Sequence, residues 1–259
     1  HWWFKDVSNV RIIGLDSNYG YQNEERLIWL ENTLLETASN TNIDFVFAQL
    51  HHPHESELWT PGNTDYTGEV INLLEEFSDN SGKPSVHFFG HTHGYSRGQS
   101  KNHTHLMVNV ASAGGSLDYW GEYPNSDYEQ YNITQDEYGY VMVDVNAGEN
   151  PEFILKRFSL GDATVFKNNS LEDSIKIKLN NSNPNKPIGI FPSLNDTINP
   201  ECVILLANEF IDIDNDEHGA TQWQIDQDCT TFSNPIIDKW EQFENWYFEI
   251  NTQDNNNLT

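Results

Sequence analysis

Short apolar runs alternate with helical patterns over the first hundred residues, and this alternation constrains the fold more than any other feature. The runs 10–16, 44–50 and 85–89 are typical of buried strands. Between them, apolar residues recur every three or four positions in 22–38 and 68–77, as on one face of an amphipathic helix. The order strand, helix, strand, helix, strand predicts an α/β unit with parallel strands.

Histidines follow two of these predicted strands directly. The segment 51–54 reads His-His-Pro-His, and the segment 90–93 reads Gly-His-Thr-His. Ligands bind at the carboxyl ends of parallel strands, so these side chains are expected to meet at one edge of the sheet. Neutral imidazole is a common ligand of zinc, iron and similar ions. The sequence therefore predicts a metal site formed by His91, His93 and at least one histidine of the segment 51–54.

Four segments in this order, 9–16, 22–31, 51–53 and 90–97, resemble the second half of the catalytic domain of the calcineurin-like metallophosphoesterases, in their purple acid phosphatase-like branch. The resemblance implies an α/β fold, as part of a metallophosphoesterase-like αββα sandwich. It also implies that His51 and His91 bind one metal ion and that His93 binds the other. Tyr95 and Arg97 match the end of the last motif and are expected to line the substrate site.

The same resemblance implies metal-dependent hydrolysis of phosphate esters, in which hydroxide bridging two divalent or trivalent ions (Fe, Zn or Mn) attacks the phosphorus. His54 is the candidate acid that protonates the leaving group, and an exposed loop histidine is the alternative. His52 is expected to face away from His51, because neighbouring residues of an extended segment point to opposite sides, or else to contact substrate. Four further histidines, His87, His103, His105 and His218, are interpreted as structural.

Three earlier motifs of that family, Asp-x-His, Gly-Asp-x-x-Asp and Gly-Asn-His-Asp or Glu, have no counterpart in this sequence. The chain opens on His1-Trp2-Trp3-Phe4 without Met, so we expect the natural N-terminus to lie upstream, where these ligands would be encoded. Two alternatives stay open. One is a non-catalytic surface-binding or structural protein that keeps the scaffold without a complete metal site, and the other is a site for a single ion.

Strand-like pieces without intervening helices follow, at 106–111, 138–145 and 153–158, and are expected to extend or cover the sheet in antiparallel fashion. We assign 1–166 to the metallophosphoesterase part and the Asn- and Pro-rich segment 167–187 to a linker. Residues 188–259 are expected to form an incomplete all-β sandwich similar to fibronectin type III modules of secreted enzymes. Its cysteines, Cys202 and Cys229, are either paired or free thiols.

The chain is strongly acidic, with 13 Lys and Arg against 40 Asp and Glu and a formal net charge of −27. This charge disfavours nucleic-acid binding through a basic patch. No apolar run is long enough to span a bilayer, and we expect a secreted or cell-surface protein whose oligomeric state the sequence leaves open. In the loop 212–216, acids at every second position suggest a calcium site, but the glycine of an EF-hand is missing and a solvated loop is the alternative.

Overall fold

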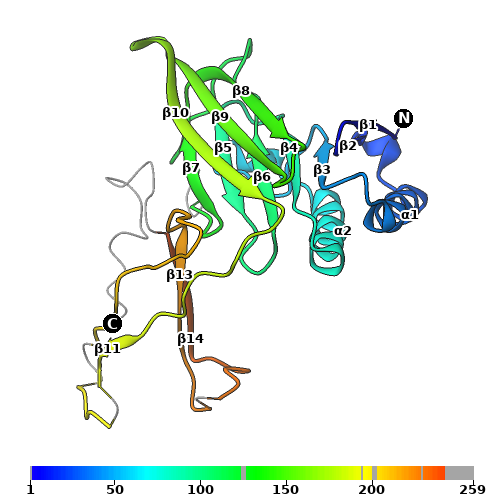
Figure 1. Ribbon diagram of the computed structural model, residues 1–259. Coiled ribbons are helices and arrows are strands. Elements are labelled where there is room, and N and C mark those ends of the chain that lie inside the picture. Colours follow the sequence, from blue (N-terminus) through cyan, green and yellow to red (C-terminus); the bar gives the residue numbers. More distant parts are fainter. Residues whose placement is uncertain (1, 124–126, 194, 200–202, 229, 243–259) are drawn as a thin grey trace. The chain divides into compact units, whose positions relative to one another are not determined.

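The computed structural model describes residues 2–123, 127–193, 195–199, 203–228 and 230–242 (Figure 1). The chain divides into two compact units, His1–Asn180 and Asn181–Thr259. All three clusters of buried hydrophobic residues found in the described part of the chain lie in the first unit. This unit also contains every histidine predicted to take part in chemistry.

The first unit is built on a seven-stranded sheet with the order β1-β2-β3-β4-β6-β5-β7. The strands are β1 (Trp3–Val7), β2 (Val10–Gly14), β3 (Phe45–Gln49), β4 (Ser85–Phe89), β5 (Tyr95–Gln99), β6 (His105–Asn109) and β7 (Tyr131–Gln135). The predicted parallel core is confirmed, because β2, β3 and β4 pair in parallel. Strand β6 was expected in an antiparallel portion, yet it pairs in parallel with β4. The chain reverses direction in β5, which lies between β6 and β7 in the sheet, and reverses again before β6.

Two helices, α1 (Glu24–Ser39) and α2 (Asp65–Ser81), cover one face of this sheet. The side chain of Asn23 caps α1 by accepting the backbone N–H of Arg26. Helix α2 ends at Gly82, whose left-handed conformation (φ 69°) suits glycine. Short 3-10 helices, η1 (Tyr19–Tyr21) and η2 (Thr60–Gly62), lie in the connections before these helices.

A second sheet packs on the opposite face of the first. It consists of the antiparallel strands β8 (Tyr138–Asn146), β9 (Glu152–Gly161) and β10 (Phe166–Lys178), in the order β10-β9-β8. Phe153 of β9 contacts Phe45 and Phe47 of β3 edge to face, with ring centroids 5.2 and 5.1 Å apart. The resulting layers of helix, sheet and sheet are consistent with a partial αββα sandwich.

Strand β10 occupies most of the segment that the sequence indicated as a linker, since residues 166–178 pair with β9. Alternation of Ile175 and Ile177 with lysines gives β10 one apolar face, which packs on the core between the sheets. The linker assignment for 167–187 was therefore wrong over its first half. The division between the two units falls after Asn180.

The described part of the second unit contains two separate two-stranded sheets. One pairs β11 (Gly189–Phe191) with β12 (Leu206–Ala207), and the other pairs β13 (Ala220–Ile225) with β14 (Ile237–Gln242). The fibronectin type III-like module remains a prediction. Both cysteines, Cys202 and Cys229, lie outside the described residues. Within the described residues, neither helix combines the length and apolar character needed to cross a membrane.

Candidate metal centre

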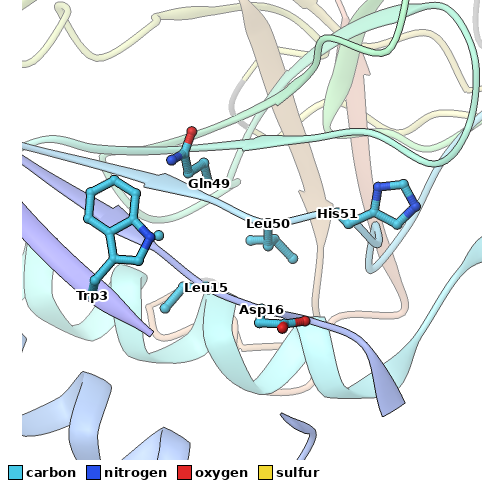
Figure 2. A pocket seen from close by; sticks show the side chains of 7 residues that line it. Trp3, Leu15, Asp16, Gln49, Leu50 and His51 are labelled. Carbon is cyan, nitrogen blue, oxygen red and sulfur yellow. The ribbon is translucent and has the colours of Figure 1, made fainter. Parts of the chain in front are cut away.

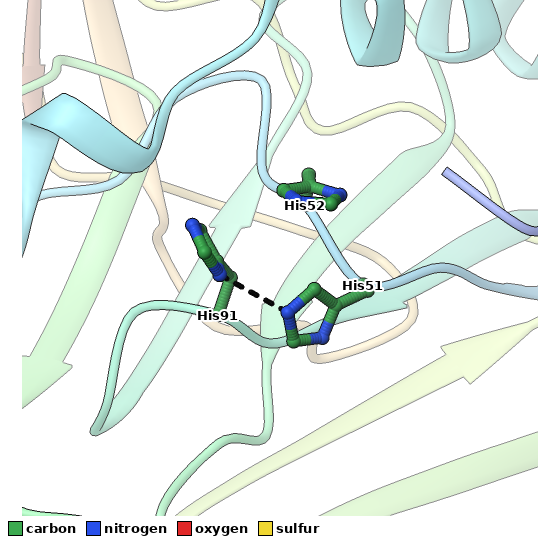
Figure 3. Close-up of side chains that lie close together, drawn as sticks. All are labelled: His51, His52 and His91. Carbon is green, nitrogen blue, oxygen red and sulfur yellow. Dashed lines mark hydrogen bonds between the residues drawn. The ribbon is translucent and has the colours of Figure 1, made fainter. Parts of the chain in front are cut away.

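Three imidazoles meet where β3 and β4 end. His51, His52 and His91 each place one ring nitrogen within 4.8 Å of the others (Figure 3). His51 and His52 follow β3, and His91 lies in the turn after β4. The parallel pairing of these two strands brings their carboxyl ends to the same edge of the sheet. The group therefore forms where the sequence pattern predicted a site.

The closest nitrogens in this group belong to His51 and His91. Nε2 of His51 lies 3.0 Å from Nδ1 of His91. Two imidazole nitrogens that bind one zinc ion at about 2.0–2.1 Å lie about 3.0–3.4 Å from each other. This contact is a hydrogen bond between the two rings (Figure 3), and its length is also that between two ligands on a common ion.

Contacts of neighbouring residues fix the turn that carries His91. His91 adopts a left-handed backbone conformation (φ 69°), which is uncommon for a residue with a side chain. Thr92 is buried and accepts hydrogen bonds at Oγ1 from Ser56 (2.8 Å) and from the Asn109 side chain (3.0 Å). The ring of His91 packs over Gly62, where a Cβ atom would lie 2.8 Å from Cδ2 of His91. These contacts fix His91 at the sheet edge.

His93 lies outside the group of three, but its hydrogen bonds leave one ring nitrogen with a lone pair that could bind an ion. Its Nδ1 lies 2.7 Å from the carbonyl oxygen of Ser116, which can only accept, so Nδ1 carries the hydrogen and Nε2 keeps a lone pair. Its backbone N–H donates to Asp118 (2.7 Å). Metal-binding histidines characteristically donate their second ring N–H in this manner.

His52 was expected to point away from His51, and this expectation was wrong. Its ring centroid lies 4.8 Å from that of His51 and 4.6 Å from that of His91. Strict alternation holds only for extended backbone, and the chain already bends at His51 and His52 before Pro53. Burial, and the charges that neighbouring histidines would carry, lower the pKa of both His52 and His91. Both rings are therefore neutral near pH 7.

The loop after β3 also carries His54, which the structure does not bring into the group. Its Nδ1 lies 3.3 Å from the carbonyl oxygen of Thr64, and its ring packs against Gly68 of α2. The same loop is anchored by Glu57, which accepts hydrogen bonds from the backbone of Tyr128 (2.7 Å) and from Thr134 (2.6 Å). Burial raises the pKa of Glu57 to about 8.

Tyr95 and Arg97 do not lie with the histidines. Both belong to β5 and turn toward β10, where the Tyr95 hydroxyl donates to Asp173 (2.5 Å) and Arg97 makes a bidentate ion pair with the same carboxylate (2.6 and 3.0 Å). Their alternate positions place them on the face of β5 that is covered by the second sheet. The expected contact with substrate is thus replaced by a buried link between the two sheets.

A cavity of about 360 Å³ begins at His51 and runs along the ends of β2 and β3 (Figure 2). Its lining consists of Trp3, Gly14, Leu15, Asp16, Gln49, Leu50 and His51. Trp3 is 44% exposed and its indole covers Gly14. The cavity combines an aromatic wall, a carboxylate and an amide beside the histidine group.

The acidic loop of the second unit folds on itself. The Asp212 carboxylate accepts the backbone N–H groups of Asp214 (2.7 Å) and Asp216 (3.1 Å). Such hydrogen bonds from the backbone to an aspartate two residues earlier are typical of a turn that the aspartate side chain stabilises. Calcium binding at 212–216 remains a prediction.

No protein-family model and no curated protein matches this chain in sequence. Among solved structures, the chain is similar to purple acid phosphatase PPD1 from yellow lupin (Lupinus luteus) seeds, with 15% identity and a TM-score of 0.53. That match covers 68% of this chain and 32% of the lupin protein. The fold of this chain is therefore similar to part of the fold of a purple acid phosphatase.

Two further solved structures are similar to this chain at lower TM-scores. The match to the structure of PhoD has 12% identity and a TM-score of 0.48, and it covers 68% of this chain and 42% of the PhoD chain. GAP50, the anchor in the inner membrane complex of Plasmodium, matches with 14% identity, covers 69% and 53% of the two chains, and has a TM-score of 0.47. The chain thus spans less than two thirds of the length of each of these proteins.

Proposed function

We infer that this chain contributes to a metal-dependent phosphoric ester hydrolase, with His51 and His91 as ligands of one ion. The observation that supports this inference most directly is the 3.0 Å separation of their ring nitrogens at the edge of a metallophosphoesterase-like sheet. His93, with Nε2 free, is the proposed ligand of a second ion. Iron, zinc and manganese all accept imidazole nitrogen.

Bound ions would supply Lewis acidity, which stabilises the negative charge that builds up on phosphoryl oxygens. The protein's own part is to hold neutral imidazoles at fixed separations and to place the ester beside them. His54 is the proposed proton donor for the leaving alcohol, because it lies on the same loop as His51. Its Nδ1 donates to the carbonyl oxygen of Thr64, so the proton given to the alcohol would have to come from Nε2 of the protonated ring.

The cavity beside His51 is the proposed site for the organic part of the ester. Trp3 offers a flat aromatic surface and Gln49 an amide. Asp16 adds a carboxylate, whose Oδ1 accepts hydrogen bonds from the backbone and side chain of Asn18. A carboxylate repels a second anionic group, so this lining suits a neutral hydroxyl-bearing alcohol better than a polyphosphate.

Hydrolysis of p-nitrophenyl phosphate in the presence of zinc, manganese or iron tests this proposal. The wild-type chain should release p-nitrophenol, and His91→Ala should lower the rate about 100-fold or more, because a ligand is lost. His103→Ala is the matched control, since His103 contacts Asp79 on α2 and lies outside the group of three. Equal rates for wild type and His91→Ala would contradict the assignment. Metal binding without hydrolysis would favour the non-catalytic scaffold.

A further inference from the structure

The hydroxyl of Ser17 has a full set of hydrogen-bond partners, and they all belong to the histidine segment after β3. Ser17 is buried and follows β2. Its Oγ accepts the backbone N–H of His51 (3.1 Å) and of His52 (3.0 Å). It also lies 3.0 Å from Nδ1 of His52. A hydroxyl has two lone pairs and one hydrogen.

This count assigns the hydrogen on the His52 ring. The two backbone N–H groups use both lone pairs of Ser17 Oγ, so the hydroxyl hydrogen points to Nδ1 of His52. Nδ1 is therefore the acceptor, and in the neutral ring Nε2 carries the hydrogen. A ring nitrogen that carries hydrogen has no lone pair to give to a metal ion.

The three histidines of the group consequently divide into two kinds. His51 and His91 face each other through nitrogens 3.0 Å apart, as two ligands of one ion do. His52 has turned Nδ1 to the buried Ser17, and its ring stands within 4.8 Å of both other rings. Its Nε2–H edge is left for a hydrogen-bond acceptor.

We propose that His52 is an anion-binding residue that donates Nε2–H to a phosphoryl oxygen beside the ion, and that Ser17 is the positioning residue that fixes this tautomer. The inference rests on the proposed function for the nature of the anion. Because a hydrogen bond to a charged oxygen is about twice as strong as a neutral one, such a donor discriminates between phosphate and a neutral ligand.

The tautomer is tested in the metal-free protein, where hydrolysis plays no part. Long-range ¹H–¹⁵N correlation spectra at pH 7.5 should show the His52 hydrogen on Nε2. Ser17→Ala should allow the hydrogen to move to Nδ1, and Ser17→Thr, which restores the hydroxyl, should return it to Nε2. A wild-type spectrum with the hydrogen on Nδ1 would overturn the proposal, whatever the protein hydrolyses.

The anion-binding role is tested by comparing two ligands. Zinc content, measured by elemental analysis, should be the same in wild type and His52→Ala but should fall in His91→Ala. Titration of zinc-loaded protein with inorganic phosphate should give about 10-fold weaker binding for His52→Ala, and His52→Gln should recover part of it. Loss of zinc in His52→Ala would make His52 a ligand and end the proposal, as would unchanged phosphate affinity. Absence of zinc from the wild type would instead refute the proposed function.

Discussion

The hydrogen bonds at each ring nitrogen separate the histidines of this chain by role. His51 and His91 face each other at 3.0 Å, and His93 has Nε2 free, so these rings can bind an ion. His87 and His105 also hydrogen-bond through their ring nitrogens (2.9 Å), but both of these side chains are fully buried. Their interpretation as structural residues agrees with this burial, although no sequence pattern predicted that they pair.

The buried pair predicts a pH effect on stability. Burial lowers the pKa of His87 to about 3, whereas the unfolded chain takes up a proton near pH 6.5. Below pH 6.5 the unfolded chain binds a proton at His87 that the folded protein does not bind, so the free energy of unfolding decreases as the pH falls below 6.5. Between pH 7.5 and 5.5, wild type should lose about 1.4 kcal/mol more unfolding free energy than His87→Gln.

Urea unfolding at the two pH values measures this difference. The comparison with His87→Gln is needed because Glu57, whose pKa burial raises to about 8, changes stability in the opposite direction over the same range. Its contribution cancels between the two proteins. The same pH dependence in both would show that His87 titrates normally in the folded state.

Gly62 permits the position of His91. In Gly62→Ala the new Cβ would lie 2.8 Å from Cδ2 of His91 and 2.9 Å from Trp59, so the imidazole must move. We expect about 10-fold weaker zinc binding, in line with the loss of other supports of metal ligands. Gly20→Ala is the matched control, since Gly20 also lies in a 3-10 helix but has open space around it. Isothermal titration with zinc would give the comparison, and equal affinities would contradict it.

At the scale of elements, the hydrophobic pattern predicted strands β2, β3 and β4 and both helices. It also predicted β6, β8 and β9, which were expected at 106–111, 138–145 and 153–158, and it failed where polar residues interrupt a strand. Strand β10 was missed because its first half, with Asn168 and Asn169, resembles a loop. The alternation from Ile175 to Ile177 was its only strand signal.

The roles of Tyr95 and Arg97 depend on this missed strand. Their shared partner, Asp173, lies 76 or more residues away in the sequence, and nothing local to β5 indicates that a second sheet covers it. The supports of the histidines, Ser17 and Gly62, were not singled out either. A serine or glycine in a turn gives no local sign that an imidazole will pack on it.

Removal of Asp173 should therefore destabilise the fold rather than disturb the site. Asp173→Ala leaves Arg97 buried without its partner, which typically costs about 3–5 kcal/mol. The double variant Arg97→Leu/Asp173→Leu removes both charges and should recover most of the stability. Urea denaturation measures both effects. If the folded double variant lost hydrolysis of p-nitrophenyl phosphate while it kept its metal, Arg97 would line the substrate site after all.

At the scale of the whole molecule, the first unit brings the predicted ligand segments to one sheet edge, and the second unit contributes no histidine to that group. The strand order and the two motifs made this convergence predictable. The net charge of −27 disfavours recognition of nucleic acid through a basic patch, but it identifies no substrate. Which ring donates and which ring binds required the hydrogen bonds of Ser17 and Ser116.

The proposed function depends above all on a metal ion between His51 and His91. Elemental analysis after zinc loading and desalting tests it directly, with the double variant His51→Ala/His91→Ala beside the wild type and His103→Ala as control. We predict at least one zinc ion per chain in wild type and in the control, and a loss of at least one ion per chain in the double variant. Equal zinc content in all three proteins would contradict the account.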